Sequence, residues 1–333
     1  MSILNEDVNN IIKNFEMSLF RDKTVLVTGA TGLIGKLCVK SLLESDFNTK
    51  VIALVRNKEK GLRVLGENNN LKFLVQDINS KINLDENVDY IIHGASVTSS
   101  SDFINKPVET IITAINGTKN VLDFAKTQPK LQAMVYLSSL EVYGVPENEN
   151  TSETDYGYID ILSARSSYSE GKKITETLCI SYCSEYNVPV KIARLAQTFG
   201  AGVDKNDNRV FAQFAKSVIN KENIILHTKG ETARNYCYTT DAVCAIFTIL
   251  TKGKVANAYN VANKNTYITI ADMAKSLENN DTKVVFEIDD INRGFNPTVK
   301  ICLDTNKLES LGWSAKIDLQ EMFERTIKSM QEY

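Results

Sequence analysis

One short stretch, residues 23–35 (KTVLVTGATGLIG), constrains the fold of this chain more than any other. Its apolar, β-branched half predicts a buried strand, and glycines then recur at every third residue as Gly29, Gly32 and Gly35. Such glycines permit a tight turn, a close approach of the backbone to a pyrophosphate, and close packing of the next helix. The free N–H groups at the start of that helix would hold the anion. The pattern therefore predicts a dinucleotide site; the alternative is a glycine-rich turn that binds nothing.

Predicted strands and helices alternate through most of the chain. Strands are expected at residues 25–27, 50–55, 71–75, 88–92, 134–137, 188–193 and 258–261, and a long helix at 107–126. Alternation of this kind predicts an α/β fold, with a doubly wound parallel (Rossmann) sheet and a smaller C-terminal α/β substrate lobe.

The chain is long enough for two parts, because single cores stop growing at about 250–300 residues. We expect residues 1–195 and 237–263 to form the dinucleotide-binding domain, with an N-terminal helix in residues 1–22. Residues 196–236 and 264–333 are expected to form the smaller lobe. The cleft between the two parts would bind the substrate.

Composition excludes several classes of function. The 333 residues carry a formal net charge of −3, which argues against nucleic-acid binding, and no apolar run reaches the length of a membrane span. The acidic N-terminus lacks the layout of a signal peptide, so a cytoplasmic location is expected. Six cysteines without CxxC pairs and only two histidines, His93 and His227, predict no metal site.

The ends of the predicted strands suggest how a cofactor would lie. Arg56 follows the second strand, where a basic residue can receive the 2′-phosphate of NADP, so the sequence leans toward NADP over NAD. The small residues Gly94, Ala95 and Ser96 follow the fourth strand and leave room for a cofactor across the strand ends. His93, at the same point, is expected to orient backbone and not to act in catalysis.

A tyrosine and a lysine follow a polar run, residues 144–158, that is expected to be a loop bordering the site. Tyr168 and Lys172 are four residues apart and so share one face of a helix. A nearby ammonium group favours the phenolate and would lower the pKa of Tyr168, giving a general base for an alcohol or sugar hydroxyl. The alternative for such a pair is a solvated helix face.

Taken together, these motifs resemble a known family, the extended short-chain dehydrogenase/reductases that modify nucleotide sugars. The resemblance covers about residues 22 to 315, in the right order. It rests on TGATGLIG at 28–35, Asp77, HGAS at 93–96, SSLEVYG at 138–144, YSEGK at 168–172, RLAQTFG at 194–200, RNYCYTTD at 234–241 and LGW at 311–313.

The resemblance implies a role for particular residues. Tyr168 would be the base, Lys172 would hold the nicotinamide ribose and Ser139 would bind the reacting sugar hydroxyl. Further cofactor contacts are implied at Thr31, Leu33, Ile34, Asp77 and Ile78, and substrate contacts at Arg165, Gln197, Arg209, Gln213 and Arg234. Asp241 is expected to cap the helix that follows it. The family also implies a homodimer formed through two helices of the Rossmann half.

Glu141 bears on the exact reaction. The 4,6-dehydratases and UDP-glucuronate decarboxylases of the family similarly have a glutamate at this position, although a solvent-facing acid is the alternative. Dehydratases of the dTDP-glucose type place an aspartate just before it, where this chain has Leu140. Against the decarboxylases, Gln197 and Gln213 stand where that group usually has asparagine.

The expected function is accordingly a nucleotide-sugar enzyme that oxidises the sugar at C4 with bound NAD(P). The 4-keto sugar would then be decarboxylated or dehydrated, and the hydride returned. The alternatives are a nucleotide-sugar 4-epimerase or an NADPH-dependent keto-sugar reductase and, more remotely, a non-catalytic dinucleotide sensor.

Overall fold

A seven-stranded parallel sheet lies at the centre of the computed structural model, which describes residues 1–288 and 298–332. The strand order is β13-β9-β5-β4-β1-β2-β3. The strands are β1 (Thr24–Thr28), β2 (Lys50–Val55), β3 (Leu71–Val75), β4 (Tyr90–His93), β5 (Ala133–Ser139), β9 (Val190–Leu195) and β13 (Ala258–Val261). All the predicted strands are confirmed, with β4 and β9 beginning two residues later than expected. The predicted doubly wound parallel sheet is confirmed as well.

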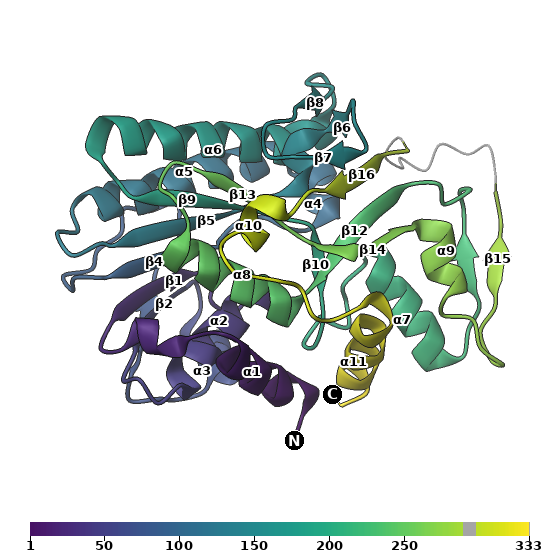
Figure 1. Cartoon of the computed structure of the whole chain (residues 1–333), viewed down its shortest axis with the longest axis horizontal. Coiled ribbons are helices and arrows are strands. Elements are labelled where there is room, and N and C mark those ends of the chain that lie inside the picture. The colour runs from purple at the N-terminus through teal and green to yellow at the C-terminus, as the bar shows by residue number, and fades with distance from the viewer. Residues whose placement is uncertain (289–297, 333) are drawn as a thin grey trace.

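Helices cover both faces of this sheet (Figure 1). They are α2 (Leu33–Glu44), α3 (Lys58–Leu65), α4 (Ser100–Asn105), α5 (Pro107–Lys126), α6 (Ser167–Tyr186) and α8 (Thr239–Lys252). Successive residues of a strand point to opposite faces, so Val25 and Val27 join the core with α2 and α8, whereas Leu26 joins the core with α5 and α6. Burial on both faces explains why β1 reads as a continuous apolar run.

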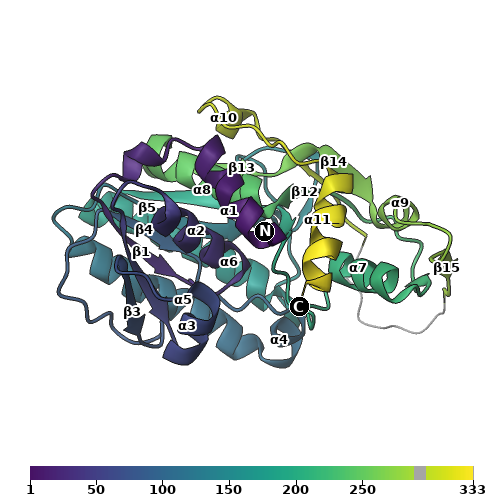
Figure 2. The ribbon, with the colours of Figure 1, turned by 90° about the horizontal axis from the view of Figure 1, so that it is seen from below.

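A second sheet of five strands lies beside the first, with α7, α9 and α11 around it (Figures 1 and 2). Its order is β10-β12-β16-β7, with β14 paired to β12; the pairs β11–β15 and β6–β8 stand apart. The strands are β6 (Val145–Pro146), β7 (Asn150–Thr151), β8 (Gly157–Tyr158), β10 (Gln197–Phe199), β11 (Ile224–Leu226), β12 (Ala233–Tyr238), β14 (Asn263–Thr269), β15 (Val284–Phe286) and β16 (Lys300–Leu303). The helices are α7 (Val210–Asn220), α9 (Ile270–Lys275), α10 (Asn306–Glu309) and α11 (Leu319–Gln331).

The polar run at residues 144–158 is not a simple loop. It contains β6, β7 and β8, and β7 pairs with β16 of the second sheet. These strands are only two residues long, which is too short for alternating hydrophobicity to reveal them. Residues 289–297 and Tyr333, which we assigned to the smaller lobe, lie outside the described residues.

Asp241 does not cap α8, contrary to expectation. The helix begins at Thr239, with Tyr238 in the capping position. The carboxylate of Asp241 instead accepts hydrogen bonds from the backbone N–H groups of Lys316 and Ile317, at 2.9 and 3.0 Å. These backbone donors lie far along the chain, so the acid fixes the segment that leads into α11.

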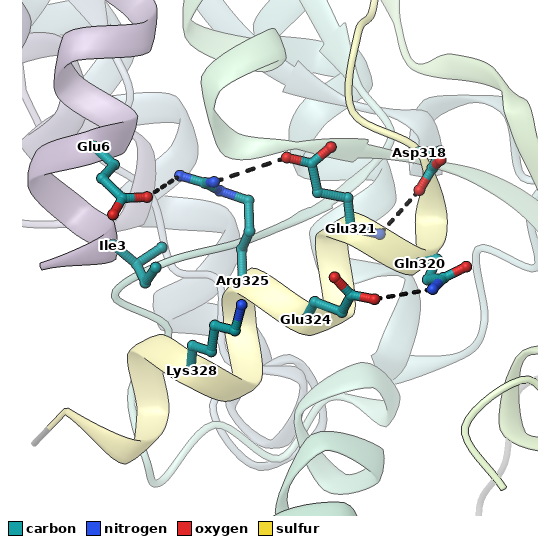
Figure 3. A pocket seen from close by; sticks show the side chains of 8 residues that line it. All are labelled: Ile3, Glu6, Asp318, Gln320, Glu321, Glu324, Arg325 and Lys328. Atoms are coloured by element: carbon teal, nitrogen blue, oxygen red, sulfur yellow. Dashed lines mark hydrogen bonds and ion pairs between the residues drawn. The ribbon is translucent and has the colours of Figure 1, made fainter. Parts of the chain in front are cut away.

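The expected N-terminal helix is confirmed as α1 (Ile3–Asn14), followed by a short 3₁₀ turn. It contacts α2, α8 and α11. Its Asp7 is fully buried, where Oδ1 accepts a hydrogen bond from Arg325 at 2.7 Å and Oδ2 one from the Tyr238 hydroxyl at 2.8 Å. Figure 3 shows Arg325 reaching from α11 toward Glu6 of α1, beside a surface hollow of about 490 Å³ that none of the predicted site residues lines.

The buried Asp7 predicts a pH-dependent stability. Burial raises the pKa of Asp7 from 3.8 to about 6, so the folded chain binds a proton more tightly than the unfolded chain. The contribution of Asp7 to the free energy of unfolding is therefore largest at low pH, and it is lost as the pH rises from about 4 to about 6. The free energy of unfolding of wild type, minus that of Asp7→Asn, should fall by about 3 kcal/mol across this window. Urea titrations at several pH values measure it, and a pH-independent difference would contradict it.

Candidate active site

The glycine turn fits a dinucleotide pyrophosphate. Gly29 has a φ of 69°, and a Cβ atom there would lie 2.8 Å from the carbonyl carbon of Gly94. A Cβ atom on Gly35 would collide with the carbonyl of Gly29. Helix α2 then begins at Leu33 without a side-chain cap, because the capping residue is Gly32. Its first-turn N–H groups therefore remain available to an anion, as the sequence predicts.

His93 ties the first strands together. Its ring is 1% exposed, and its two nitrogens pair with Thr28 Oγ1 at 2.7 Å and Thr118 Oγ1 at 2.9 Å. Burial lowers the pKa of His93 to about 3, so the ring is neutral. The Thr28 hydroxyl also accepts the N–H of Ala95, which fixes the segment after β4 against the glycine turn. The expected structural role of His93 agrees with this geometry.

Two further strand ends carry the residues expected at the far end of the cofactor. Arg56 is exposed directly after β2. Asp77 is exposed after β3, where its Oδ1 accepts the N–H of Asn79 at 2.8 Å, and Ile78 beside it is buried. The contacts of all three with a cofactor stay predictions.

Ser139, Glu141 and Tyr168 come together at the end of β5. The strand ends at Ser139 and a 3₁₀ turn (Leu140–Tyr143) follows, in which the Glu141 N–H donates to Ser139 Oγ at 3.2 Å. Tyr168 is the second residue of α6, and the Ser139 side chain and the Glu141 charge both act on the pKa of its hydroxyl. A strand end and a helix start thus bring three of the predicted catalytic groups together.

Lys172 lies one turn further along α6 and is 4% exposed. Its Nζ donates to the carbonyl of Leu137 in β5 at 2.7 Å and lies 5.8 Å from the centre of the Tyr168 ring. Burial lowers the pKa of Lys172 to about 8, while the carboxylate of Glu176 opposes this shift.

The predicted lowering of the Tyr168 pKa combined Lys172 with the charge of a nicotinamide, and in the chain by itself the pKa is raised instead. Burial raises the pKa of Tyr168 well above its ordinary value, and the charge of Glu141 raises it further. The Ser139 side chain and the charges of Arg165 and Arg209 oppose the shift. Tyr168 is therefore a neutral phenol at neutral pH, because desolvation outweighs the nearby cations.

Glu141 is held by Arg165, in the 3₁₀ turn just before α6, and by Ser169, in the first turn of α6. Arg165 Nη2 donates to its Oε1 at 2.9 Å, and Ser169 Oγ donates to its Oε2 at 3.1 Å. Both carboxylate oxygens are thus paired and the charge of Glu141 acts on Tyr168, so the alternative of a free, solvent-facing acid does not describe it.

Sequence reasoning missed two supports of this site. Phe103 of α4 stacks on the Tyr168 ring, with the ring centres 4.2 Å apart. Beneath the site, Glu176 pairs with Arg194 at 2.7 Å and accepts the hydroxyl of Ser138 at 2.5 Å. A lone phenylalanine carries no sequence signal, but Glu176 follows Lys172 by four residues and so could have been placed on the same helix face.

The predicted substrate residues fall into two groups. Arg209 precedes α7 and forms a two-pronged ion pair with Asp207, and its charge acts on Tyr168. Gln213, in the first turn of α7, donates to the carbonyl of Asn208. The second group comprises Gln197 and Arg234, which lie on the neighbouring strands β10 and β12. The Nε of Arg234 is buried and has no hydrogen-bond partner among the residues that the structure describes.

Comparison with known proteins decides the family. Residues 25–262 match the NAD dependent epimerase/dehydratase family. The chain belongs to this family. The matched region begins at the first strand of the central sheet and ends just after its last, so it spans all of the proposed catalytic residues. Within the described residues, this family member has no helix long and apolar enough to cross a membrane.

Curated relatives of this epimerase/dehydratase family member include decarboxylases. It is 28% identical over 312 residues to UDP-glucuronic acid decarboxylase 1 of Danio rerio, covering 92% of this chain and 72% of the relative. It is 29% identical over 305 residues to UDP-glucuronic acid decarboxylase 3 of Arabidopsis thaliana, covering 89% of this chain and 86% of the relative.

Solved structures with the same fold include epimerases. An epimerase from Methanothermobacter thermautotrophicus has a TM-score of 0.82 at 22% identity, covering 97% of this chain and 95% of that one. The UDP-glucuronic acid 4-epimerase of Bacillus cereus, solved with NAD, has a TM-score of 0.75 at 20% identity, covering 93% and 99%.

Proposed function

We propose that this protein oxidises a UDP-linked sugar acid at C4 and then decarboxylates the 4-keto sugar. The observation that carries the proposal is the grouping of Glu141 with Ser139 and Tyr168 at one strand end, beside a turn that fits a dinucleotide. The curated decarboxylases at 28–29% identity support the choice of a glucuronic acid.

The first step removes hydrogen from the C4 hydroxyl as a proton and a hydride. NAD, when bound, supplies the hydride acceptor and a positive charge that favours the phenolate of Tyr168. The phenolate oxygen takes the hydroxyl proton, and Ser139 holds the same hydroxyl by a hydrogen bond. Lys172 anchors its ammonium on the carbonyl of Leu137 and would meet the cofactor ribose from there.

The second step uses the ketone. A ketone at C4 makes a C6 carboxylate the carboxylate of a β-keto acid, whose C5–C6 bond breaks with its electrons moving into the enolate and carbon dioxide leaving. Protonation at C5 and return of the hydride to C4 would then complete a cycle with no net redox change. Glu141, fixed beside Tyr168, would assist at C5 or C6, and Arg234 would meet the diphosphate or the carboxylate.

A 4-epimerase is the second candidate. It would share the C4 oxidation and return the hydride to the other face of the ketone, with no chemistry at C5 or C6. Leu140 lacks the acid that a dehydratase of the dTDP-glucose type places there, which argues against dehydration and leaves inversion at C4 as another outcome for the same 4-keto sugar. A keto-sugar reductase is the third, and the basic Arg56 is what favours it.

The spectrum of the purified protein tests whether the cycle restores its own cofactor. We expect the protein to retain NAD(H), visible by nicotinamide absorbance after denaturation, because such an enzyme must hold the cofactor through both steps. A protein that purifies empty and steadily oxidises added NADPH would instead be a reductase.

Arg56 predicts cofactor preference. If its exposed guanidinium receives a 2′-phosphate, Arg56→Glu should weaken NADP binding by about tenfold to a hundredfold, the usual value of one coupled charge interaction, and leave NAD binding within about twofold. Calorimetric titration of the two cofactors checks it, with exposed Arg63→Glu as a matched control. Equal losses of affinity for NAD and NADP would show that Arg56 does not favour NADP.

We also propose a homodimer and a cytoplasmic location. Helices α5 and α6 pack side by side and carry the exposed apolar residues Val108, Ile112 and Ile174, which a second copy could cover. Light scattering of the purified protein should give twice the chain mass of 37.2 kDa, and Val108→Glu with Ile112→Glu should give the monomer. A wild type that is monomeric by light scattering would contradict the proposed dimer.

A further inference from the structure

The start of α6 makes contacts that point to a role for Arg165 other than substrate binding. Its guanidinium carbon lies 4.8 Å from the centre of the Phe103 ring, while its Nη2 donates to Glu141. The same phenylalanine stacks nearly parallel on Tyr168, with 13° between the ring planes. Arg165 thus contacts a ring that packs on the catalytic tyrosine and, separately, the carboxylate beside that tyrosine.

The remaining residues of this segment strengthen both contacts. Ser167 Oγ donates to the carbonyl of Phe103 at 2.9 Å, and Ser169 Oγ donates to Glu141 at 3.1 Å. Phe103 is 3% exposed, and Ser167 and Ser169 are buried as well. Residues 165–169 therefore bind two partners, Phe103 and Glu141, in addition to supplying Tyr168.

We infer that Arg165 and Phe103 are positioning residues, which fix Glu141 and Tyr168 relative to each other, and that Arg165 does not bind the substrate. This replaces the substrate contact that the family resemblance implies for Arg165, and it rests on the proposed function for its kinetic test. The guanidinium suits the task because its plane stacks on a ring while its edge donates to a carboxylate.

Charge gives a physical reason for the pairing. The charge of Glu141 makes it harder to form the Tyr168 phenolate, and the charge of Arg165 makes it easier. The contact between Arg165 and Glu141, at 2.9 Å, keeps a carboxylate close to the reacting sugar. The positive charge of Arg165 offsets part of the rise that this carboxylate causes in the pKa of Tyr168. Removing Arg165 alone would leave Glu141 with the hydrogen bond from Ser169 but without the cation that offsets its charge.

A double-mutant cycle in kcat and KM tests the inference with Arg165→Gln, Glu141→Gln and the double variant. Arg165→Gln should lower kcat by about tenfold to a hundredfold, with KM for the UDP-sugar changed less than about threefold, because misplacement affects chemistry more than binding. In the Glu141→Gln background the same change should cost less than about threefold, since groups that act through one another are not additive. If the losses of kcat in the two single variants combine additively in the double variant, the inference is overturned.

Binding separates the two roles of Arg165 without requiring turnover. By calorimetry, Arg165→Gln should keep the wild-type ratio of affinities for UDP-glucuronate and UDP-glucose. A loss confined to UDP-glucuronate would mean that Arg165 holds the sugar carboxylate and would overturn the inference. A wild type that binds neither sugar would overturn the proposed function. The unfolding midpoints of the wild type, the two single variants and the double variant would still test the pairing of Arg165 with Glu141. Non-additive changes in the midpoints support the pairing, and additive changes refute it.

Matched variants exclude a merely structural effect. Phe103→Tyr keeps a ring and should stay within about threefold of wild-type kcat, whereas Phe103→Leu should lose about tenfold and shift the pH dependence of kcat, because Tyr168 loses its packing. Arg21 lies 4.6 Å over the ring of Phe47, far from the site in sequence, and Arg21→Gln should leave kcat unchanged. Equal kcat and pH profiles for the two Phe103 variants would show that the stacking positions nothing.

Discussion

Replacing Tyr168 with phenylalanine is expected to lower turnover by at least about a thousandfold, in the upper range for a lost acid–base group. Only one hydroxyl is removed, and the ring still stacks on Phe103, so folding and nucleotide binding should change little. The C4 hydroxyl proton would lose its acceptor, while Ser139 would keep the hydrogen bond from the Glu141 N–H.

The control for this variant lies on the same helix. Tyr182 also donates its hydroxyl in a hydrogen bond, to Asp123 at 2.7 Å, but on a later part of α6. Tyr182→Phe should therefore keep wild-type turnover. Steady-state assays with unfolding curves for both variants make the measurement, and near-normal activity of Tyr168→Phe would refute its assignment as the base.

Glu141→Gln is expected to stop the cycle part-way. The amide keeps the shape of the side chain and one acceptor oxygen for Arg165 or Ser169, but it cannot take or give a proton at C5 or C6. Oxidation at C4 would still proceed, since Ser139 and Tyr168 remain. The overall rate should fall by about a hundredfold or more, and reduced cofactor should accumulate, visible by its absorbance and fluorescence in single-turnover experiments.

A second carboxylate on α6 provides the comparison. Glu170 pairs with Lys173 at 3.7 Å and has neither of the Glu141 contacts, so Glu170→Gln should turn over normally without a build-up of reduced cofactor. If Glu141→Gln itself turns over normally, its acid has no role at C5 or C6. An epimerase or a reductase would then be the better description.

Most strands of the central sheet could be predicted from the sequence because they are buried on both faces, and each of these reads as a run of β-branched and apolar residues. The edge strand β3 was predicted from its apolar residues alone, since none of its side chains is fully buried. The two-residue strands β6, β7 and β8 carry no such period and were missed. Asp241 was misplaced because its partners, the N–H groups at 316 and 317, belong to a segment that no local pattern connects to it.

The candidate site was predictable where chemistry depends on spacing along the chain. Tyr168 and Lys172 are one helical turn apart, and Ser139 and Glu141 lie two residues apart at a strand end. The raised pKa of Tyr168 in the chain by itself could not be predicted, because sequence spacing shows the neighbouring cation but not the desolvation of the ring. The contacts of Phe103 and Arg165 depend on how α4 packs against α6, which only the tertiary structure contains.

Incubation of the purified protein with UDP-glucuronate, followed by mass spectrometry of the product, tests the central claim most directly. We predict a UDP-pentose, lighter than the substrate by one carbon dioxide, formed with no net consumption of NAD and absent with Tyr168→Phe. A product of unchanged mass with inverted C4 would contradict decarboxylation and identify an epimerase. No product from UDP-glucuronate, with turnover of another nucleotide sugar in the same assay, would contradict the proposed substrate.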